Sequence, residues 1–277
     1  RDYYASRGLG DVYKRQGDKR VYMAEQFYDI TRPVIREYHS KFIRQSVNAF
    51  HGSNGVVHSI GLEYTGPLHF MNFWLEEVHA CDNHQLVALT ATKDVQDAVL
   101  KDKKHASMVD VIDIRQWHYR ADGTLYEPQG GISLAPRQHA RLIDPGTVSC
   151  ASVYRAVREY RRKYPDKAVV YNGSTARVPH NAMNWAVFMA GGSFAKVPPV
   201  DELPVYEKAS AFSPIDIQTD MDTQWVMGAV GKGYLGYCVK DEIHLDLAED
   251  GGMYKVFWID PDKGTVLKKD GRVKGGR

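Results

Sequence analysis

Two carboxylates in this chain stand near the ends of apolar stretches. Residues 56–64 are typical of a short strand that runs into Glu63 and is stopped by a Gly-Pro turn, and Asp113 lies near the end of a second apolar stretch, 108–115. In barrels of alternating strands and helices, catalytic residues stand at the carboxyl ends of strands, because loops converge there while the strands hold them rigid. A glutamate in that position indicates acid–base chemistry.

A long stretch without apolar periodicity, from Gln116 to Val148, carries many polar and aromatic side chains. Loops of this length inside a compact domain are uncommon and usually functional. Aromatic rings stack on the apolar faces of sugars, while arginine and histidine offer donors to hydroxyl groups, so the mixture fits one wall of a sugar cleft. Packing under the loop is the other interpretation for each aromatic ring. The side chains concerned are Trp117, His118, Tyr119, Tyr126, Arg137, His139 and Arg141.

Other chemistries find less support in the sequence. His118 and His139 have no metal-ligand spacing around them, so we predict no metal site. Ser174 and Ser193 each follow a glycine but lack the Gly-x-Ser-x-Gly elbow of serine hydrolases. We also predict no cofactor. The residues expected to contact a substrate are Tyr64, Arg115, Trp117, His118, Tyr119, Glu127, Arg137, His139 and Asn172.

Helices and strands alternate along the chain as far as about residue 200, which is typical of an α/β fold with parallel strands. The absence of a glycine-rich phosphate loop after any strand favours a barrel over an open doubly wound sheet. The predicted helices are 28–50, 68–80, 94–100, 152–164 and 180–190, and the predicted strands are 56–64, 85–91, 108–115, 167–171 and 192–197.

Beyond residue 198 the pattern changes to short runs of β-branched and aromatic residues separated by turn sequences. This predicts a small antiparallel β domain, most simply a sandwich, with strands at 224–230, 234–239, 242–247 and 254–259. Trp225 and Trp258 are expected to fill its core. The predicted boundaries are 17–203 for the α/β domain and 204–277 for the β domain.

The first sixteen residues stand apart from this pattern. The hexapeptide 11–16 resembles translated sequencing-adapter DNA, so we treat residues 1–16 as an assembly artefact and exclude them from the fold. A disordered basic tail is the alternative. This segment holds four of the 36 Lys and Arg and two of the 34 Asp and Glu, which leaves 32 against 32 in the remainder.

A neutral chain with dispersed charge offers no electrostatic footprint for nucleic acid, so nucleic acid is not an expected partner. No apolar run approaches the ~20 residues that a membrane span needs. The three cysteines, Cys81, Cys150 and Cys238, match no metal spacing and cannot all pair within the chain. The oligomeric state stays open.

Several segments together carry a family resemblance: the long helix 28–50, Gly61-Leu62-Glu63-Tyr64-Thr65-Gly66-Pro67-Leu68, the stretch 112–119 (IDIRQWHY) and the closing 258–261 (WIDP). In this order they resemble apiosidase-like bacterial glycoside hydrolases. Those proteins are (β/α)8 TIM barrels followed by a β-sandwich labelled as a collagen-binding domain. The resemblance covers most of residues 17 to 265. It implies a carbohydrate substrate and a periplasmic or extracellular location.

The resemblance also assigns positions in the barrel. Helix 28–50 would be the third helix, and Glu63 would end the fourth strand, where related enzymes carry the acid/base. The first strands are then absent, so we expect exposed sheet edges, aggregation and doubtful activity of this fragment. The family places a nucleophilic glutamate after the seventh strand, but here strand 167–171 is followed by Asn172.

Cleavage of a glycosidic bond needs one carboxyl group to protonate the leaving oxygen and a second to attack carbon or activate water. Glu63 is the predicted general acid/base. Asp113 is preferred over Glu127 as the second carboxylate, although strand alternation leaves open whether it faces the barrel interior or the helices. Positions two strands apart favour inversion. The alternative is a non-catalytic carbohydrate-binding or scaffold protein built on a degenerate barrel.

Overall fold

A computed structural model describes residues 26–61, 64, 66–114, 119, 124, 149–172, 180–200, 203–216, 224–239 and 242–276. The chain forms two compact units that divide between Thr147 and Val148. The boundary at 203/204 stays a prediction. Residues 1–16, for which we predicted a foreign origin, lie outside the described part.

The first unit is built on three short parallel strands, β1 (Val57–Ile60), β2 (Leu86–Leu89) and β3 (Val111–Ile114), in the order β1-β2-β3. Ile60 lies opposite Leu89, and Leu89 lies opposite Ile112, so the carboxyl ends of the three strands meet at one edge. All four residues of β3 are buried, as the continuous apolar run predicted. Parallel strands joined by helices confirm an α/β fold for this unit.

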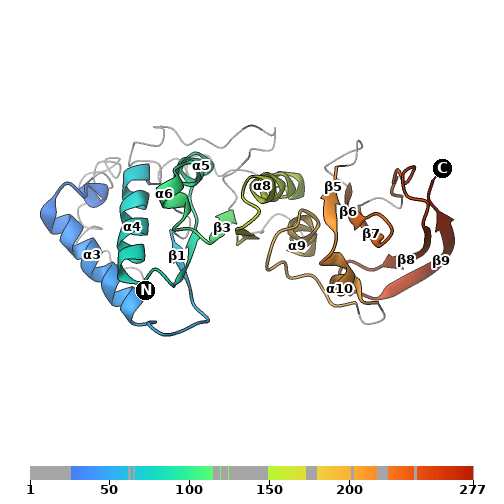
Figure 1. Cartoon of the computed structure of the whole chain (residues 1–277), viewed down its shortest axis with the longest axis horizontal. Coiled ribbons are helices and arrows are strands. Elements are labelled where there is room, and N and C mark those ends of the chain that lie inside the picture. The colour runs from blue at the N-terminus through green and yellow to red at the C-terminus, as the bar shows by residue number, and fades with distance from the viewer. Residues whose placement is uncertain are drawn as a thin grey trace, which may run out of the picture. The chain divides into compact units, whose positions relative to one another are not determined.

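Helices connect these strands and cover them: α3 (Pro33–Asn48), α4 (Leu68–Cys81), α5 (Lys93–Lys101) and the single turn α6 (Lys103–Ala106). Proline in the first turn of α3 costs no hydrogen bond, because that backbone position has no partner in any helix. Figure 1 shows α3 alongside α4, and the two helices are in contact. Helix α3 is shorter at both ends than the predicted helix 28–50.

An aromatic cluster joins the segment before α3 to α4. Tyr28 and Phe70 are buried at its centre, with ring centroids 4.8 Å apart and nearly perpendicular planes. Tyr64 and Trp74 are partly buried against them. Trp74 follows Phe70 by one turn of α4, and their ring centroids lie 5.9 Å apart.

The second unit begins with α8 (Cys150–Lys163), β4 (Ala168–Tyr171), α9 (His180–Met189) and the short α10 (Val205–Ala209). A capping box starts α8: the backbone N–H of Ser152 donates to the Ser149 hydroxyl, and the backbone N–H of Ser149 donates to the Ser152 hydroxyl. Both donors would otherwise lack a partner at the helix start. The cap fixes where α8 begins.

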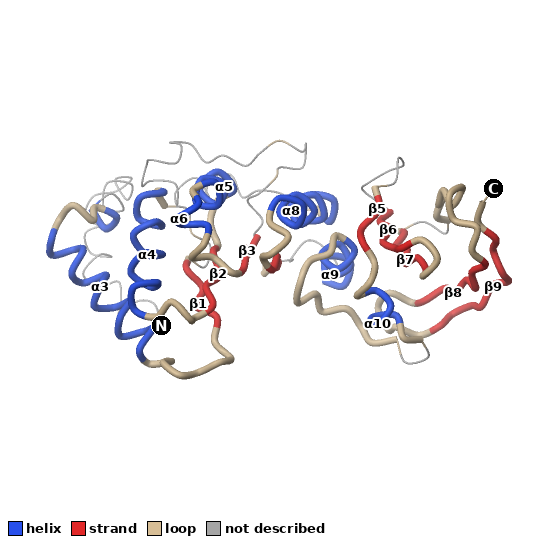
Figure 2. The backbone as a smooth tube through the Cα atoms, viewed as in Figure 1, coloured by secondary structure: helices blue, strands red, loops and turns tan. Residues whose placement is uncertain are grey.

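Two antiparallel sheets complete this unit (Figure 2), as the turn-rich sequence predicted. One contains β5 (Ser213–Ile215), β6 (Gln224–Ala229) and β7 (Gly233–Cys238), and the other pairs β8 (Met253–Ile259) with β9 (Val266–Lys274). Trp225 of β6 is 1% exposed and stacks on Tyr237 at 5.0 Å and on Tyr154 of α8 at 5.5 Å. The prediction that Trp225 fills a core is confirmed, whereas Trp258 of β8 is only partly buried, and its indole Nε1 donates to Asp270 at 2.7 Å.

Two predicted strands are wrong. Residues 192–197 form turns and irregular chain, because Phe194 has a positive φ of 56° and is 83% exposed, which no strand residue in a core would be. Residues 242–247 belong to no strand. Both runs mix apolar with polar residues, and neither contributes to a sheet.

Among the described residues, no helix combines the length and apolar character that crossing a bilayer requires.

Candidate active site at the carboxyl edge of the parallel strands

The carboxyl edge of β2 and β3 holds a buried polar pair. Asp113 of β3 is 2% exposed, and its Oδ2 accepts a hydrogen bond of 2.9 Å from the hydroxyl of Thr90, which directly follows β2 and is fully buried. A carboxylate out of contact with water needs such donors, because losing hydration costs several kcal/mol. The two neighbouring strands thus fix the position of this carboxylate.

A buried cation lies in the same region of the chain. Lys93 begins α5 three residues after Thr90, its side chain is 2% exposed, and its Nζ donates to Asp97 at 2.8 Å. The same Nζ lies 5.6 Å from the ring centroid of Tyr119. Lysine is rarely buried unless it is paired, so this arrangement marks a site where charge is held at a structural cost.

The turn after β1 packs directly against this edge. Gly61 has a φ of 74°, and a Cβ atom built there would lie 2.8 Å from the carbonyl oxygen of Thr90. The backbone N–H of Thr90 in turn donates to the carbonyl oxygen of Ile60 at 3.1 Å. Only glycine fits this close approach with a left-handed backbone. The segment that leads to Glu63 therefore leaves β1 beside Thr90.

The predicted site residues fall into two groups. Among those described, Asp113 and Tyr119 lie in the first unit as above, and Tyr64 joins the aromatic cluster, where its hydroxyl donates to the carbonyl oxygen of Pro67 at 2.6 Å. Asn172 is exposed directly after β4 in the second unit. The others lie outside the described residues: Glu63, Arg115, Trp117, His118, Glu127, Arg137 and His139.

Sequence reasoning missed Thr90 and Lys93. The predicted strand 85–91 included Thr90, and Lys93 fell between it and the predicted helix 94–100, whereas β2 ends at Leu89 and α5 begins at Lys93. A lysine flanked by short polar residues directly after an apolar strand was the available signal, because βα connections at this edge carry functional residues.

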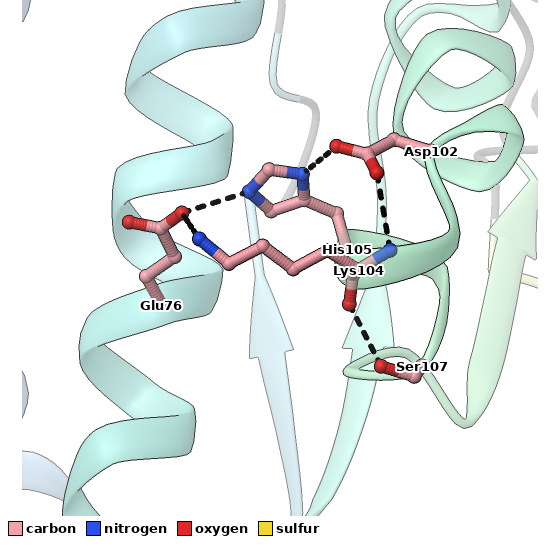
Figure 3. A network of polar contacts seen from close by, with 5 residues as sticks. All are labelled: Glu76, Asp102, Lys104, His105 and Ser107. Carbon is pink, nitrogen blue, oxygen red and sulfur yellow. Dashed lines mark hydrogen bonds and ion pairs between the residues drawn. The ribbon is translucent and has the colours of Figure 1, made fainter.

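A second polar network lies away from this edge and links α6 to α4. His105 of α6 is 7% exposed; its Nδ1 lies 2.5 Å from Asp102 and its Nε2 3.0 Å from Glu76 of α4 (Figure 3). Lys104 also donates to Glu76, at 2.5 Å. Because α6 leads into the amino end of β3, this network lies away from the carboxyl edge that holds Asp113.

The pKa values in this network move in one direction. The hydrogen bond from Lys104, followed by that from His105, lowers the pKa of Glu76. Hydrogen bonds from His105 and from the backbone N–H of Lys104 lower the pKa of Asp102. Both carboxylates are thus stabilised as anions, and the network ties α6 to α4.

Among the described residues, no group of three or more histidine, cysteine or acidic side chains has an arrangement that could hold a metal ion.

Comparison of the chain with curated proteins and with solved structures gave no match. A protein family described as "Domain of unknown function (DUF6298)" matches residues 7–212. The match includes residues 7–16, which lie in the segment that we predicted to be an assembly artefact. It covers all of the first unit's strands and helices, and extends through α8, α9 and α10 of the second. The chain belongs to the DUF6298 family.

Proposed function

We propose that this chain is part of a glycoside hydrolase that cleaves bonds in an oligo- or polysaccharide, with a TIM-barrel domain and a C-terminal β-sandwich. Glu63 is the general acid/base and Asp113 the second carboxylate. The carbohydrate is held by the loop that follows β3. The proposal combines the family resemblance of the sequence with the chemistry of the carboxyl edge.

The observation that carries the proposal is the position of Asp113. It lies at the carboxyl edge of β3, two strands from β1, in a sheet whose neighbouring strands are ~4.8 Å apart. The chain leaves β1 through Gly61 beside Thr90 and reaches Glu63 two residues later. A separation of two strands supports an inverting pair, whose carboxyl groups stand ~6.5–9.5 Å apart, over a retaining pair at ~5 Å.

Because Asp113 is buried, the experiment must distinguish a catalytic role of this carboxylate from a positioning role. A second carboxylate touches water or the sugar, whereas a carboxylate that is 2% exposed could instead position Thr90 and the strand ends. In the first role, Asp113→Asn removes the group that activates water and lowers kcat by about 10²-fold or more. In the second role, Asp113→Asn leaves the pH profile of kcat bell-shaped, because both titrating catalytic groups are still present.

The test is turnover of a panel of plant and bacterial oligosaccharides. We expect Glu63→Gln to lower kcat by about 10²–10⁴-fold, with folding unchanged by circular dichroism. Asp110→Asn is the matched control for Asp113→Asn, since Asp110 precedes β3 at the opposite edge and accepts from the backbone N–H of Val87 at 2.8 Å. Full turnover by Glu63→Gln would rule out the proposed mechanism.

One observation favours a second candidate, a carbohydrate-binding protein without turnover. The chain after β4 continues with Asn172, where the resembled enzymes place a nucleophilic glutamate. An amide can hydrogen-bond a sugar hydroxyl but cannot attack the anomeric carbon. Saturable binding of an oligosaccharide with no product after long incubation would select this candidate.

A further inference from the structure

A cavity of about 440 Å³ opens within the second unit. Its lining comes from the carboxyl half of α8, the turn after α9, α10 and the sheet strands β5 and β6. Sites for small molecules usually measure about 300–1,000 Å³, so one small ligand fits here. Neither the carboxyl edge of β1–β3 nor the proposed hydrolysis involves this cavity.

The charge of the cavity comes from α8. Arg158, Arg161 and Arg162 all line it, and the lining residues that the structure describes include no carboxylate. Arg161 is already engaged, because its Nη1 donates to the carbonyl oxygens of Pro165 at 3.2 Å and Lys167 at 2.7 Å. Arg158 and Arg162 are the two guanidinium groups left to meet a ligand.

Both of these arginines pair with one carboxylate. Arg158 donates to Oδ1 of Asp216 at 2.9 Å, and Arg162 donates to Oδ2 of the same residue. Two cations therefore share one anion, and the group of three keeps a charge of +1. The hydrogen bond from Arg158 is the largest cause of the lowered pKa of Asp216, which stays ionised near neutral pH.

The arginine pair is open on one side. The Arg162 side chain is 59% exposed and that of Asp216 is 56% exposed, whereas Arg158 is 14% exposed and held in place. A guanidinium group has five N–H donors in a planar fork that matches carboxylate and phosphate oxygens. The carboxylate of Asp216 occupies the place that the carboxylate or phosphate of a ligand would take. An incoming anion can replace it on Arg162 without moving Arg158.

The remainder of the cavity is apolar and aromatic. Phe188 and Tyr206 meet edge to face with centroids 5.6 Å apart, and Phe212, Pro214 and Met227 also line the space. Such a surface contacts the uncharged body of a ligand, for example the C–H face of a sugar ring. The backbone at Gly192 is part of this wall, and a Cβ there would come within 2.6 Å of a Val187 methyl carbon.

We propose that this cavity binds a small molecule that carries a carboxylate or phosphate group, which engages Arg162 and Arg158 in competition with Asp216. The apolar wall holds the rest of the ligand. The site lies outside the carboxyl edge of the parallel strands, so it stands or falls independently of the proposed hydrolysis.

The test is isothermal titration calorimetry of the whole chain with glucuronate, glucose 6-phosphate, inorganic phosphate and uncharged glucose. We expect a sugar anion to bind more tightly than inorganic phosphate, because the apolar wall contributes, and glucose not to bind. Tighter binding of glucuronate identifies a carboxylate as the recognised group, and tighter binding of glucose 6-phosphate identifies a phosphate.

Three variants should change the affinity for the anion in different directions. Arg162→Gln removes an exposed donor and should weaken binding roughly tenfold. Asp216→Asn removes the competing charge and should strengthen binding. Arg155→Gln, the same change of charge on α8 outside the lining, should leave it unchanged. No binding of any anion, equal losses in Arg162→Gln and Arg155→Gln, or no gain in Asp216→Asn would overturn the site.

Discussion

The hydroxyl of Thr90 donates to the carboxylate of Asp113 across two neighbouring parallel strands, over 2.9 Å and out of contact with solvent. The bond joins Thr90, which directly follows β2, to Asp113, the penultimate residue of β3. Because both groups are buried, neither can exchange its partner for water. The pair therefore couples the stability of the first unit to the geometry of the candidate site.

Thr90→Val keeps the shape of the side chain and removes the donor. We expect a loss of about 1–3 kcal/mol in the free energy of unfolding, because a buried carboxylate loses a partner. Urea denaturation measures this loss. The matched control is Thr31→Val, whose hydroxyl donates to Asp29 at the surface and which should cost less than ~0.5 kcal/mol. Equal losses would show that the buried bond contributes nothing special.

Gly61→Ala tests the tight turn after β1. The left-handed backbone alone costs an alanine roughly 1–2 kcal/mol, and the approach to the Thr90 carbonyl adds to it. Gly52→Ala separates the two effects, since Gly52 has a φ of 78° with nothing within 4 Å of a Cβ there. The melting temperature of Gly61→Ala should be clearly lower than that of Gly52→Ala. Matching melting temperatures would contradict the close approach.

His105→Leu tests the network between α4 and α6. At neutral pH we expect a loss of about 1–2 kcal/mol, because two partly exposed carboxylates lose a donor. Folding lowers the pKa values of Glu76 and Asp102. Their contribution to the free energy of unfolding is therefore present above pH 4.5 for Glu76 and above pH 3.8 for Asp102, and it is lost as the pH falls. Urea titrations should therefore show the variant approaching the wild type in acid.

The control for this network is His51→Leu, in which an exposed histidine beside Asp82 is replaced. Its effect should stay small at every pH, as surface ion pairs contribute about 0–1 kcal/mol. A loss in His105→Leu that persists unchanged below pH 3 would mean that packing, and not the pair of carboxylates, is what the histidine provides.

Tyr234 should titrate far from the ordinary range. Its hydroxyl donates to Asp250 at 2.6 Å, and this hydrogen bond is the main reason why its pKa is raised from 10.0 to about 12. Stability from this raised pKa is complete below 10 and is lost as the pH climbs toward 12. Carbon NMR of labelled tyrosine follows the ionisation directly. Asp250→Asn should return the midpoint toward 10.0, and an unchanged midpoint would refute the assigned cause.

Much of the first unit could be predicted from sequence, because its signals are local. Helix 68–80 was predicted and α4 spans Leu68–Cys81, since apolar residues recur there at helical spacing. Strand β9 was missed for the opposite reason. Its sequence is largely charged and it pairs only with β8, so no alternation of buried and exposed residues marks it.

The candidate site was predicted only in part. Asp113 could be found because an acid inside an apolar strand conflicts with its surroundings. The burial of Lys93 could not, because its partner Asp97 is close in sequence but the ring of Tyr119 reaches it from beyond β3. Contacts between residues distant in sequence leave no periodic pattern, and they decide which charged side chains a fold can enclose.

Asp250 accepts hydrogen bonds from Tyr234 of β7, from Tyr254 of β8 and from the backbone N–H of Gly231 in the hairpin between β6 and β7. Since β7 and β8 belong to different sheets, one side chain serves as their common tether. Amide exchange in the two sheets should then accelerate in step when that tether is cut, as it would in a single cooperative folding block.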